Sequence, residues 1–515
     1  MKVFAFALLT FGLISQARAG ALPSCKDQWR GQRYDYDFHE DYQSFQSRLH
    51  RDGCEKDWTV LVYMAADNSL FPYALMDLYE MEAAFKSRNV AGSTLKTDLL
   101  VQVDGPATDD LRRLHIFSGP VQYEEKSKDD FADKTLDVIQ SPVVARLPEN
   151  DGKTERERLS EFLTWAARRY PSRHYMVIVW GHGQGWKSFP VEDPASSRLL
   201  HASDAPAFPK PAPDKSFGGI AFRQSSGTWL DVPALSSALG DLRDAIGKPV
   251  DVYASDACLM QMLEVAYEVG ANARFVVGSA QVQSFFGLPY RRILYELNKG
   301  SFDGLHKENR DSEDGSDEPY LLAKMIPILM KASLNPRGHG LQSSDKEAIK
   351  TMTSSALTIG EFDSQLVPAM ATLGNALRAY LLEDSSRAME LRYITQNVPN
   401  IEGSAQDFGV FLGFVDQLLA EERAKKSESP AGAVLRDAVA GAKDALDRTV
   451  LSYTYGESYG VDAHSQLTGF VPRAVSIWLP VSGAELQKRR DEFQASRFYR
   501  ATHWQDWLDT LFAKK

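Results

Sequence analysis

Short apolar runs alternate with amphipathic stretches along most of the chain up to residue 300. Runs that are apolar throughout indicate strands buried on both faces, whereas apolar side chains at helical spacing indicate helices with one buried side. The predicted strands are residues 58–64, 97–103, 175–180, 250–254 and 275–278, with 111–117 at an edge, and the predicted helices are residues 77–85, 159–170 and 259–269. This alternation predicts an α/β fold in which helices cover both faces of a mostly parallel sheet. We expect chemistry at the carboxyl ends of its strands.

Two stretches interrupt the alternation. Residues 187–228 are rich in Pro, Ser, Gly and Ala and predict a long loop, and residues 301–345 begin with a polar, acidic run typical of a linker or surface loop. The acidic residues of that run fit no EF-hand spacing, so a solvated loop is favoured over a calcium site. The chain that follows is mainly helical, with one late strand-like run at residues 474–479. We therefore expect an α/β domain at residues 58–300 and a C-terminal accessory domain at residues 346–515.

The N-terminal residues have the pattern of an export signal. A positive charge at Lys2, an almost wholly apolar run at residues 3–14 and small residues just after it predict a signal peptide at residues 1–19. A lipid anchor at Cys25 is the alternative, but the proline two residues earlier and the gap after the apolar run disfavour it. The apolar run is too short to cross a bilayer, and no later run reaches roughly 20 apolar residues. We expect a secreted or periplasmic protein with no transmembrane segment.

The charge and the cysteine count narrow the classes further. The 515 residues carry a formal net charge of −11, and an acidic surface repels phosphate, which argues against a nucleic-acid partner. In an oxidising compartment Cys25 and Cys54 are natural disulfide partners, so we predict that bond in an N-terminal segment at residues 20–57. Cys258 is left over, and a lone thiol in an exported protein is either buried and inert or reactive.

The first chemical motif follows the predicted strand at residues 175–180. It places His182 among glycines at positions 181, 183 and 185. Glycines let the backbone turn sharply and bring N–H groups close to a ligand, and an imidazole accepts a proton near neutral pH. A phosphate loop is disfavoured because the Walker and dinucleotide spacings are missing, and a serine elbow fails because no serine stands at its nucleophile position. For His182 taken alone, a hydrogen-bonded turn histidine is the simpler interpretation.

The second motif follows the predicted strand at residues 250–254. Cys258 stands where the helix at residues 259–269 is expected to begin, and the N-terminus of a helix stabilises a thiolate. Taken alone, Cys258 is as well explained by a buried thiol as by a nucleophile. The presence of His182 favours the nucleophile, because neighbouring parallel strands can place a thiol and an imidazole side by side, as nucleophilic acyl transfer requires.

This pairing also suggests how charge would be stabilised. The backbone N–H groups of Gly183 and Cys258 are candidate donors to an oxyanion that develops during the reaction. A zinc site is the competing use of a cysteine and a histidine, but it needs three or four ligands. The sequence offers no second cysteine or nearby histidine for such a site.

The chain resembles the clostripain family of cysteine peptidases, relatives of caspases, gingipains and legumains. The resemblance rests on residues 58–70 (WTVLVYMAADNSL), 175–186 (YMVIVWGHGQGW) and 251–262 (DVYASDACLMQM), with weaker agreement at residues 288–290 and 476–480. It implies a caspase-like α/β/α sandwich as the catalytic domain, followed by the C-terminal accessory domain.

The resemblance also implies roles for individual residues. His182 would be the general acid/base, Cys258 the nucleophile and Asp256 the acid that faces a basic side chain of the substrate, while Ser279 and Gln281 would line the same pocket. A carboxylate binds Arg bidentately and Lys as a point charge, which suits this role for Asp256. The alternative is that Asp256 caps the following helix.

The function that we expect is therefore secreted cysteine endopeptidase activity on proteins or peptides, with cleavage after Arg or Lys through a thioester. No cofactor is required, although calcium is compatible with the resemblance. Family members often cut their own loop after the histidine strand, which predicts a zymogen with processing candidates at Arg198, Lys210, Lys215 and Arg223. The rival functions are a non-catalytic exported binding module on the same scaffold and a transpeptidase.

Overall fold

The computed structural model describes most of the chain from residue 54 onward. The described residues are 24–25, 54–83, 92–106, 111–119, 124, 126–148, 151–186, 218–284, 286–299, 317–333, 350, 352–398, 400–402, 405–457, 459 and 472–513. The predicted signal peptide lies outside them, and so does most of the predicted loop at residues 187–228.

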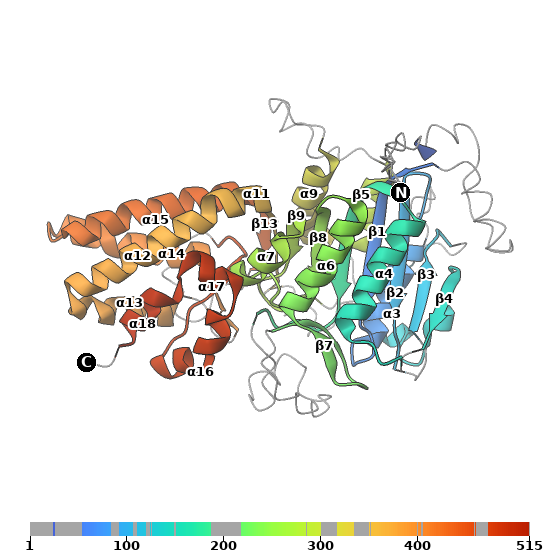
Figure 1. The fold of residues 1–515 in the computed structure, drawn as a ribbon, viewed down its shortest axis with the longest axis horizontal. Helices are drawn as coiled ribbons and strands as arrows, with labels where there is room; N and C mark the ends of the chain where they lie inside the picture. The colour runs from blue at the N-terminus through green and yellow to red at the C-terminus, as the bar shows by residue number, and fades with distance from the viewer. Residues whose placement is uncertain are drawn as a thin grey trace, which may run out of the picture.

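A mixed, mostly parallel sheet forms the core of the part of the molecule that lies on the right in Figure 1. In the described part of the chain its nine strands lie in the order β13 (Val450–Tyr455), β10 (Thr353–Thr358), β9 (Ala273–Gly278), β8 (Val250–Asp256), β5 (Ser172–Trp180), β1 (Lys56–Met64), β2 (Thr97–Val103), β3 (Leu111–His115) and β4 (Val143–Leu147). The five strands from β9 to β2 are parallel to one another. Antiparallel pairs complete the sheet on both sides.

Two helical layers cover the sheet, as a sheet whose strands are apolar on both faces requires. In β1, for example, Leu61 and Tyr63 belong to one buried cluster and Val60 and Val62 to the other. The first layer contains α4 (Glu155–Arg169), α6 (Val232–Ile246) and α7 (Leu263–Gly270), and the second contains α3 (Phe71–Glu82), α8 (Tyr290–Lys299) and α9 (Glu318–Ser333). The predicted α/β/α fold class is therefore confirmed.

Local sequence signals fix where these helices begin and end. Thr154 and Glu157 form a reciprocal capping box at the start of α4, which satisfies two backbone donors that a helix end leaves open. Asp231 caps α6, whose first turn contains Pro233, and Gly247 ends it in the left-handed conformation. This arrangement of proline at the start and glycine at the end is the one that helix geometry favours.

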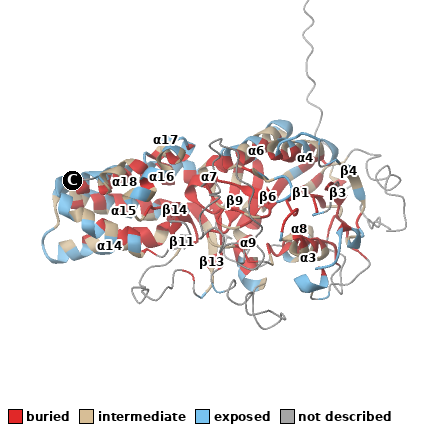
Figure 2. Ribbon diagram, turned by 90° about the horizontal axis from the view of Figure 1, so that it is seen from below, coloured by how far each residue is buried: buried red, intermediate tan, exposed pale blue. Residues whose placement is uncertain are grey.

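The C-terminal region is mainly helical, as predicted, and extends away from the sheet (Figure 1). Its elements are α11 (Ile359–Glu361), the π-helical turn η3 (Phe362–Leu366), α12 (Val367–Glu383), α13 (Ala388–Asn397), α14 (Phe408–Ala424), α15 (Pro430–Thr449), α16 (Gly483–Gln494), α17 (Arg497–Thr502) and α18 (Gln505–Leu511), with a small sheet of β11 (Asn400–Glu402), β12 (Ala405–Asp407) and β14 (Ser476–Trp478). The apolar residues of these helices belong to the same buried cluster as those of α4, α6 and α7. Figure 2 shows this buried interior in both parts of the molecule.

The predicted boundaries between domains need correction. The stretch at residues 301–345 is not wholly a linker, because α9 lies within it and buries Leu322 and Ile326 completely. The acidic run before α9 and the proline inside it hid this helix in the sequence. The central sheet also does not end at residue 300, since β10 and β13 add two strands from the predicted accessory domain.

Two further predictions were wrong in detail. The strand at residues 111–117 is shorter and is not at the edge, because β4 pairs with its outer side. The predicted loop at residues 187–228 ends in structure, since β6 (Ile220–Arg223) and β7 (Thr228–Leu230) form a two-stranded sheet. The glycine-rich sequence around β6 gave no strand signal, because the strand is only four residues long.

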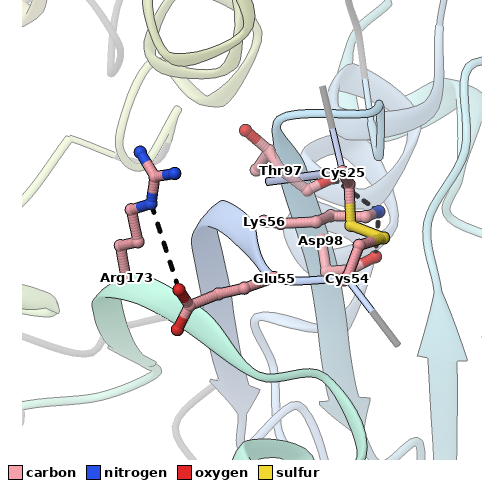
Figure 3. Close-up of a disulfide and its surroundings, with 7 residues drawn as sticks. All are labelled: Cys25, Cys54, Glu55, Lys56, Thr97, Asp98 and Arg173. Carbon is pink, nitrogen blue, oxygen red and sulfur yellow. Dashed lines mark hydrogen bonds and ion pairs between the residues drawn. A yellow bond between two sulfur atoms is a disulfide. The ribbon is translucent and has the colours of Figure 1, made fainter. Parts of the chain in front are cut away.

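The predicted disulfide joins Cys25 to Cys54 just before β1 (Figure 3). It lies beside a buried ion pair in which Lys56 Nζ is 2.6 Å from Asp98 Oδ1. A sulfur atom in a disulfide cannot also carry a lipid, so this bond argues against the lipid anchor at Cys25. Within the described residues, no helix has both the length and the apolar character to span a membrane.

The shared sheet predicts that the chain does not divide at residue 345. A chain that ends there loses β10 and β13, which leaves the apolar strand β9 with an unpaired edge, and such edges aggregate. We expect this truncated chain to be insoluble when it is expressed alone, and residues 346–515 supplied on a second chain to restore soluble protein. Solubility and circular dichroism measure the outcome, and a soluble, folded chain that ends at residue 345 would contradict the shared sheet.

Candidate active site

The two predicted motifs lie at the carboxyl ends of neighbouring strands. β5 and β8 pair in parallel up to Trp180 and Asp256, and the N–H of Gly181 donates to the main-chain oxygen of Asp256 at 3.2 Å. His182 and Cys258 each stand two residues beyond the last paired position. The structure therefore brings the predicted histidine and cysteine to the same rim of the sheet.

Gly183 brings the two segments into direct contact. A Cβ atom at this position would overlap the main-chain oxygen of Cys258 and would lie 2.9 Å from Cβ of Ala257. Real Cβ atoms do not approach other heavy atoms so closely, so a glycine is required here. Its N–H group belongs to a backbone that passes immediately beside Cys258.

His182 is partly buried between β5 and the start of β6. Its carbonyl oxygen accepts a hydrogen bond from the N–H of Ala221 at 2.9 Å. Burial lowers the pKa of the His182 imidazole to about 4, because the charged form loses hydration. At neutral pH the ring is therefore uncharged, and an uncharged ring can accept a proton.

Cys258 is half-buried and lies outside the disulfide. The N–H of Gln283 donates to its Sγ atom at 3.3 Å. The predicted helix start at this residue is wrong, because α7 begins at Leu263 and Leu259 has a positive φ of 62°. The irregular segment after Cys258 is instead fixed by main-chain hydrogen bonds to neighbouring elements.

Ser279 and Gln281, predicted to line a pocket, supply these hydrogen bonds. The N–H of Leu259 donates to the carbonyl of Gln281 at 3.1 Å, and the N–H of Gln261 donates to the carbonyl of Ser279 at 3.0 Å. The Ser279 side chain is fully buried, and its hydroxyl bonds with the hydroxyl of Thr353 at 2.9 Å. Ser279 therefore supports the cysteine segment through its carbonyl group, and its own hydroxyl is buried against Thr353.

Asp256 is buried at the end of β8 and caps no helix. Its carboxylate accepts hydrogen bonds from Gln283 Nε2 at 3.1 Å, the Leu288 N–H at 2.9 Å and the Tyr290 hydroxyl at 2.8 Å. Burial raises the pKa of Asp256 to about 6, although these three donors oppose the shift. The carboxylate is thus held in one orientation two residues before Cys258.

The sequence did not single out two side chains that the structure places around Asp256. Gln283 contacts the Asp256 carboxylate with its side chain and Cys258 Sγ with its backbone. Asp77 of α3 accepts a hydrogen bond from Trp180 Nε1 at 2.7 Å, and burial, followed by the charge of Asp256, raises its pKa well above the usual range. The position of Asp77 between the apolar residues Met76 and Leu78 could have indicated a buried carboxylate. No feature of the sequence distinguished Gln283.

Among the four processing candidates, only Arg223 lies within the described residues. Arg198, Lys210 and Lys215 lie outside the described residues. Arg223 is only 3% exposed in β6, where its guanidinium is paired with carboxylates. This burial argues against cleavage after Arg223 in the folded chain, because a peptidase needs the backbone around the cut to be accessible.

Metal ligands do not gather in the part of the chain that the structure describes. No group of three or more His, Cys, Asp or Glu side chains is arranged there to hold an ion. The expectation that calcium is compatible with this protein stays a prediction.

Comparison with known proteins places this site in a family. The sequence profile of the clostripain family, peptidase family C11, matches residues 62–510. A comparison with curated proteins gave no match.

Two solved structures share the fold. A secreted C11 cysteine protease from Bacteroides thetaiotaomicron, in complex with an irreversible peptide inhibitor, is 20% identical with a TM-score of 0.50, and the match covers 87% of this chain and 99% of that one. A second structure of a secreted C11 cysteine protease from the same organism, called iotapain, is 15% identical with the same TM-score and the same coverage. At these identities the two structures support the fold alone, whereas the family profile spans most of the sequence. The chain therefore belongs to the clostripain family of cysteine peptidases.

Proposed function

We propose that the protein is an exported endopeptidase that cuts after Arg or Lys, with Cys258 as the nucleophile and His182 as the general acid/base. The observation that supports this most is the contact between the segments that follow the two strands, where only a glycine fits at position 183 against the main-chain oxygen of Cys258. A half-buried thiol and an uncharged imidazole at one rim are the groups that acyl transfer from a peptide needs.

In the proposed reaction Cys258 Sγ attacks the carbonyl carbon of the scissile peptide and forms a carbon–sulfur bond. His182 takes up the thiol proton and gives it to the leaving amine as the carbon–nitrogen bond breaks. Water then attacks the thioester carbon while His182 accepts a proton from that water. The carbon–sulfur bond breaks, His182 returns the proton to the sulfur, and the acid product leaves. The N–H groups of Gly183 and Cys258 are the proposed oxyanion donors, and such a donor is worth about 3–4 kcal/mol where it has been measured.

Asp256 is the proposed determinant of specificity. Its carboxylate lies next to the cysteine segment and is oriented by three donors, and its negative charge would attract a cation from the substrate. A guanidinium can bind such a carboxylate through two parallel hydrogen bonds, and an ammonium group binds it as a point charge. This difference favours Arg over Lys.

Export and self-processing complete the proposal. The signal-like N-terminus and the disulfide both suit an oxidising compartment outside the cytosol. Arg198, Lys210 and Lys215 lie between the two catalytic segments and match the proposed specificity. We leave Arg223 out of this group because of its burial.

The first test is covalent labelling of the full-length protein. An irreversible electrophile with an arginyl group should label wild-type protein on Cys258, as located by mass spectrometry, and should not label Cys258→Ala. His182→Ala should lower kcat by about 10⁴-fold or more, because removal of one member of a catalytic unit disables the whole. His174→Ala, at the other end of β5, is the control and should retain activity. Labelling of a different residue would sink the assignment of the nucleophile.

The second test concerns charge at Asp256. Asp256→Asn should lower kcat/KM for an arginyl substrate by about 30-fold or more, since loss of one partner of a buried charge pair costs about 2 kcal/mol or more. A substrate with a neutral residue at the same position should be affected less. Asp251→Asn, at the opposite end of the same strand, is a matched control with no expected change in selectivity.

The same variant makes a prediction about pH. Because the pKa of Asp256 is about 6, the carboxyl gains a proton as the pH falls through that value and loses its attraction for arginine. The preference of the wild-type protein for arginyl over neutral substrates should therefore fall below pH 6. Asp256→Asn should show a flat preference over the same range, and an equally flat wild-type profile would count against Asp256.

The third test concerns processing. Wild-type protein that cuts itself should run as two chains on a denaturing gel, whereas Cys258→Ala should run as one. Replacement of Arg198, Lys210 and Lys215 together by Ala should also give one chain. A separate assay measures whether this variant still cleaves an added substrate. A Cys258→Ala protein that is still cut, with no other peptidase present, would exclude self-processing.

A further inference from the structure

The carbonyl groups and N–H groups around His182 are paired with a short segment that follows residue 217. The N–H of Ala221 donates to the carbonyl of His182, the N–H of Gln184 to that of Gly219, and the N–H of Gly219 to that of Gly185, each at 2.9 Å. We call residues 219–223 the histidine clasp. Its residues Gly219 and Ala221 pair with the loop that bears His182.

The clasp fits closely and adopts an unusual backbone conformation. Ala221 has a φ of 61°, which side chains with a Cβ atom rarely adopt. A Cβ atom on Gly181 would lie 3.3 Å from Cα of Ala221, so the backbone segments that contain these two residues touch directly beside His182. A strained backbone of this kind persists only where surrounding contacts over-determine it.

Arg223, the last residue of the clasp, supplies such contacts. Its buried guanidinium lies between two carboxylates, with Nε 2.5 Å from Asp104 Oδ2 and Nη1 3.3 Å from Glu155 Oε1. Asp104 directly follows β2, and Glu155 begins α4. A buried cation must keep its partners because it cannot regain water, so the clasp is tied to two separate elements.

The two carboxylates are themselves fixed. Asp104 Oδ1 accepts hydrogen bonds from the N–H groups of Ala66 at 2.5 Å and Asp67 at 3.0 Å, in the loop after β1. Glu155 accepts hydrogen bonds from the Tyr63 hydroxyl at 2.8 Å and the Thr228 hydroxyl at 3.1 Å. Arg223 therefore joins the clasp to a frame built from the ends of β1, β2 and α4.

The loop after β1 also holds the clasp directly. Asn68 Nδ2 donates to the carbonyl of Phe222 at 2.8 Å, and the N–H of Gln224 donates to the carbonyl of Asp67 at 2.7 Å. These bonds and the Arg223 pairs together tie the clasp to the loop after β1, to the end of β2 and to the start of α4. His182 receives both constraints through the main chain.

We propose that Arg223 is a positioning residue for the peptidase reaction, because its paired guanidinium fixes the clasp and the clasp fixes the main chain at His182. The inference rests on the proposed role of His182. It gives a basic residue in this region a task unrelated to processing. A cut between residues 187 and 217 would leave His182 and the clasp on different chains, and the Arg223 pairs would then keep the clasp in place.

Arg223→Met tests the proposal in the full-length protein. We expect kcat to fall about a hundredfold with KM changed by less than about twofold, since a displacement near 1 Å of a catalytic group has effects of that size. Arg223→Lys keeps the positive charge, but it lacks the planar fork that bridges both carboxylates. Its kcat should therefore be about tenfold higher than that of Arg223→Met and still below the wild-type value.

Lys56→Met is the matched control. Lys56 is also a buried cation paired with a carboxylate, Asp98, but it lies at the opposite end of the sheet from His182. Both variants should lower the melting temperature, whereas only Arg223→Met should lower kcat of the folded protein. Wild-type kcat in Arg223→Met, or an equal loss of kcat in Lys56→Met, would overturn the proposal.

A second variant covers failure of Arg223→Met to fold. Asp104→Asn retains an oxygen for the N–H groups of Ala66 and Asp67 and removes the carboxyl group beside Arg223. Because burial raises the pKa of Asp104 to about 7, the comparison is made at about pH 8, where the wild-type carboxyl is ionised, and we expect kcat to fall about tenfold. An unchanged kcat in this variant would refute the role of Arg223. Full activity of His182→Ala, or no activity of the wild-type protein on any peptide, would instead refute the proposed function.

Discussion

The parallel pairing of β5 with β8 is the constraint on which the rest of this protein depends. The pairing is made by the main chains of two buried strands, and among the paired residues Asp256 also has a proposed role at the site. Because both strands run in the same direction, each delivers the residues that follow it to one rim. The chemistry then requires only that the two following segments remain close, which Gly183 permits.

Those segments are not regular structure, so other parts of the chain must hold them. The histidine segment is paired with the clasp, and the cysteine segment is bonded to the residues after β9. The C-terminal region contributes as well, because the N–H of Ser476 donates to the carbonyl of Gln261 at 3.0 Å. Trp186 packs on Trp478 and Phe493, with ring centroids 5.1 Å apart in both cases. The region predicted as an accessory domain is thus part of the support of the site.

The sequence predicted the central parallel strands well, because a strand buried on both faces is apolar along its whole length. It did not predict β10, whose residues include Ser354 and Ser355. Those hydroxyl-bearing residues are buried in the sheet, and Ser355 Oγ donates to the carbonyl of Ala474 at 2.7 Å. A polar side chain can be buried only where it finds a hydrogen-bond partner, and here the partner is distant in sequence. The local pattern of apolar residues therefore could not reveal this strand.

The candidate site shows the same division. His182, Cys258 and Asp256 were found because short motifs mark them, and the structure brings them to one rim. The helix start at Cys258 was wrong because the main chain after it is hydrogen-bonded to Ser279, Gln281 and Ser476 before α7 begins. The part that Arg223 plays in the structure was also beyond reach, because a buried arginine and a surface arginine look alike until Asp104 and Glu155 are placed around it.

The disulfide and the lone thiol lie at opposite ends of the sheet. Cys54 precedes β1 and Cys258 follows β8, so roughly the length of the nine-residue strand β1, about 30 Å at 3.3 Å per residue, separates them. Thiol–disulfide exchange requires a thiolate to contact a sulfur atom of the disulfide. The folded sheet keeps Cys258 too far from the disulfide for that contact. Once the strands have paired, the bond between Cys25 and Cys54 can persist without exchange with Cys258, the proposed nucleophile.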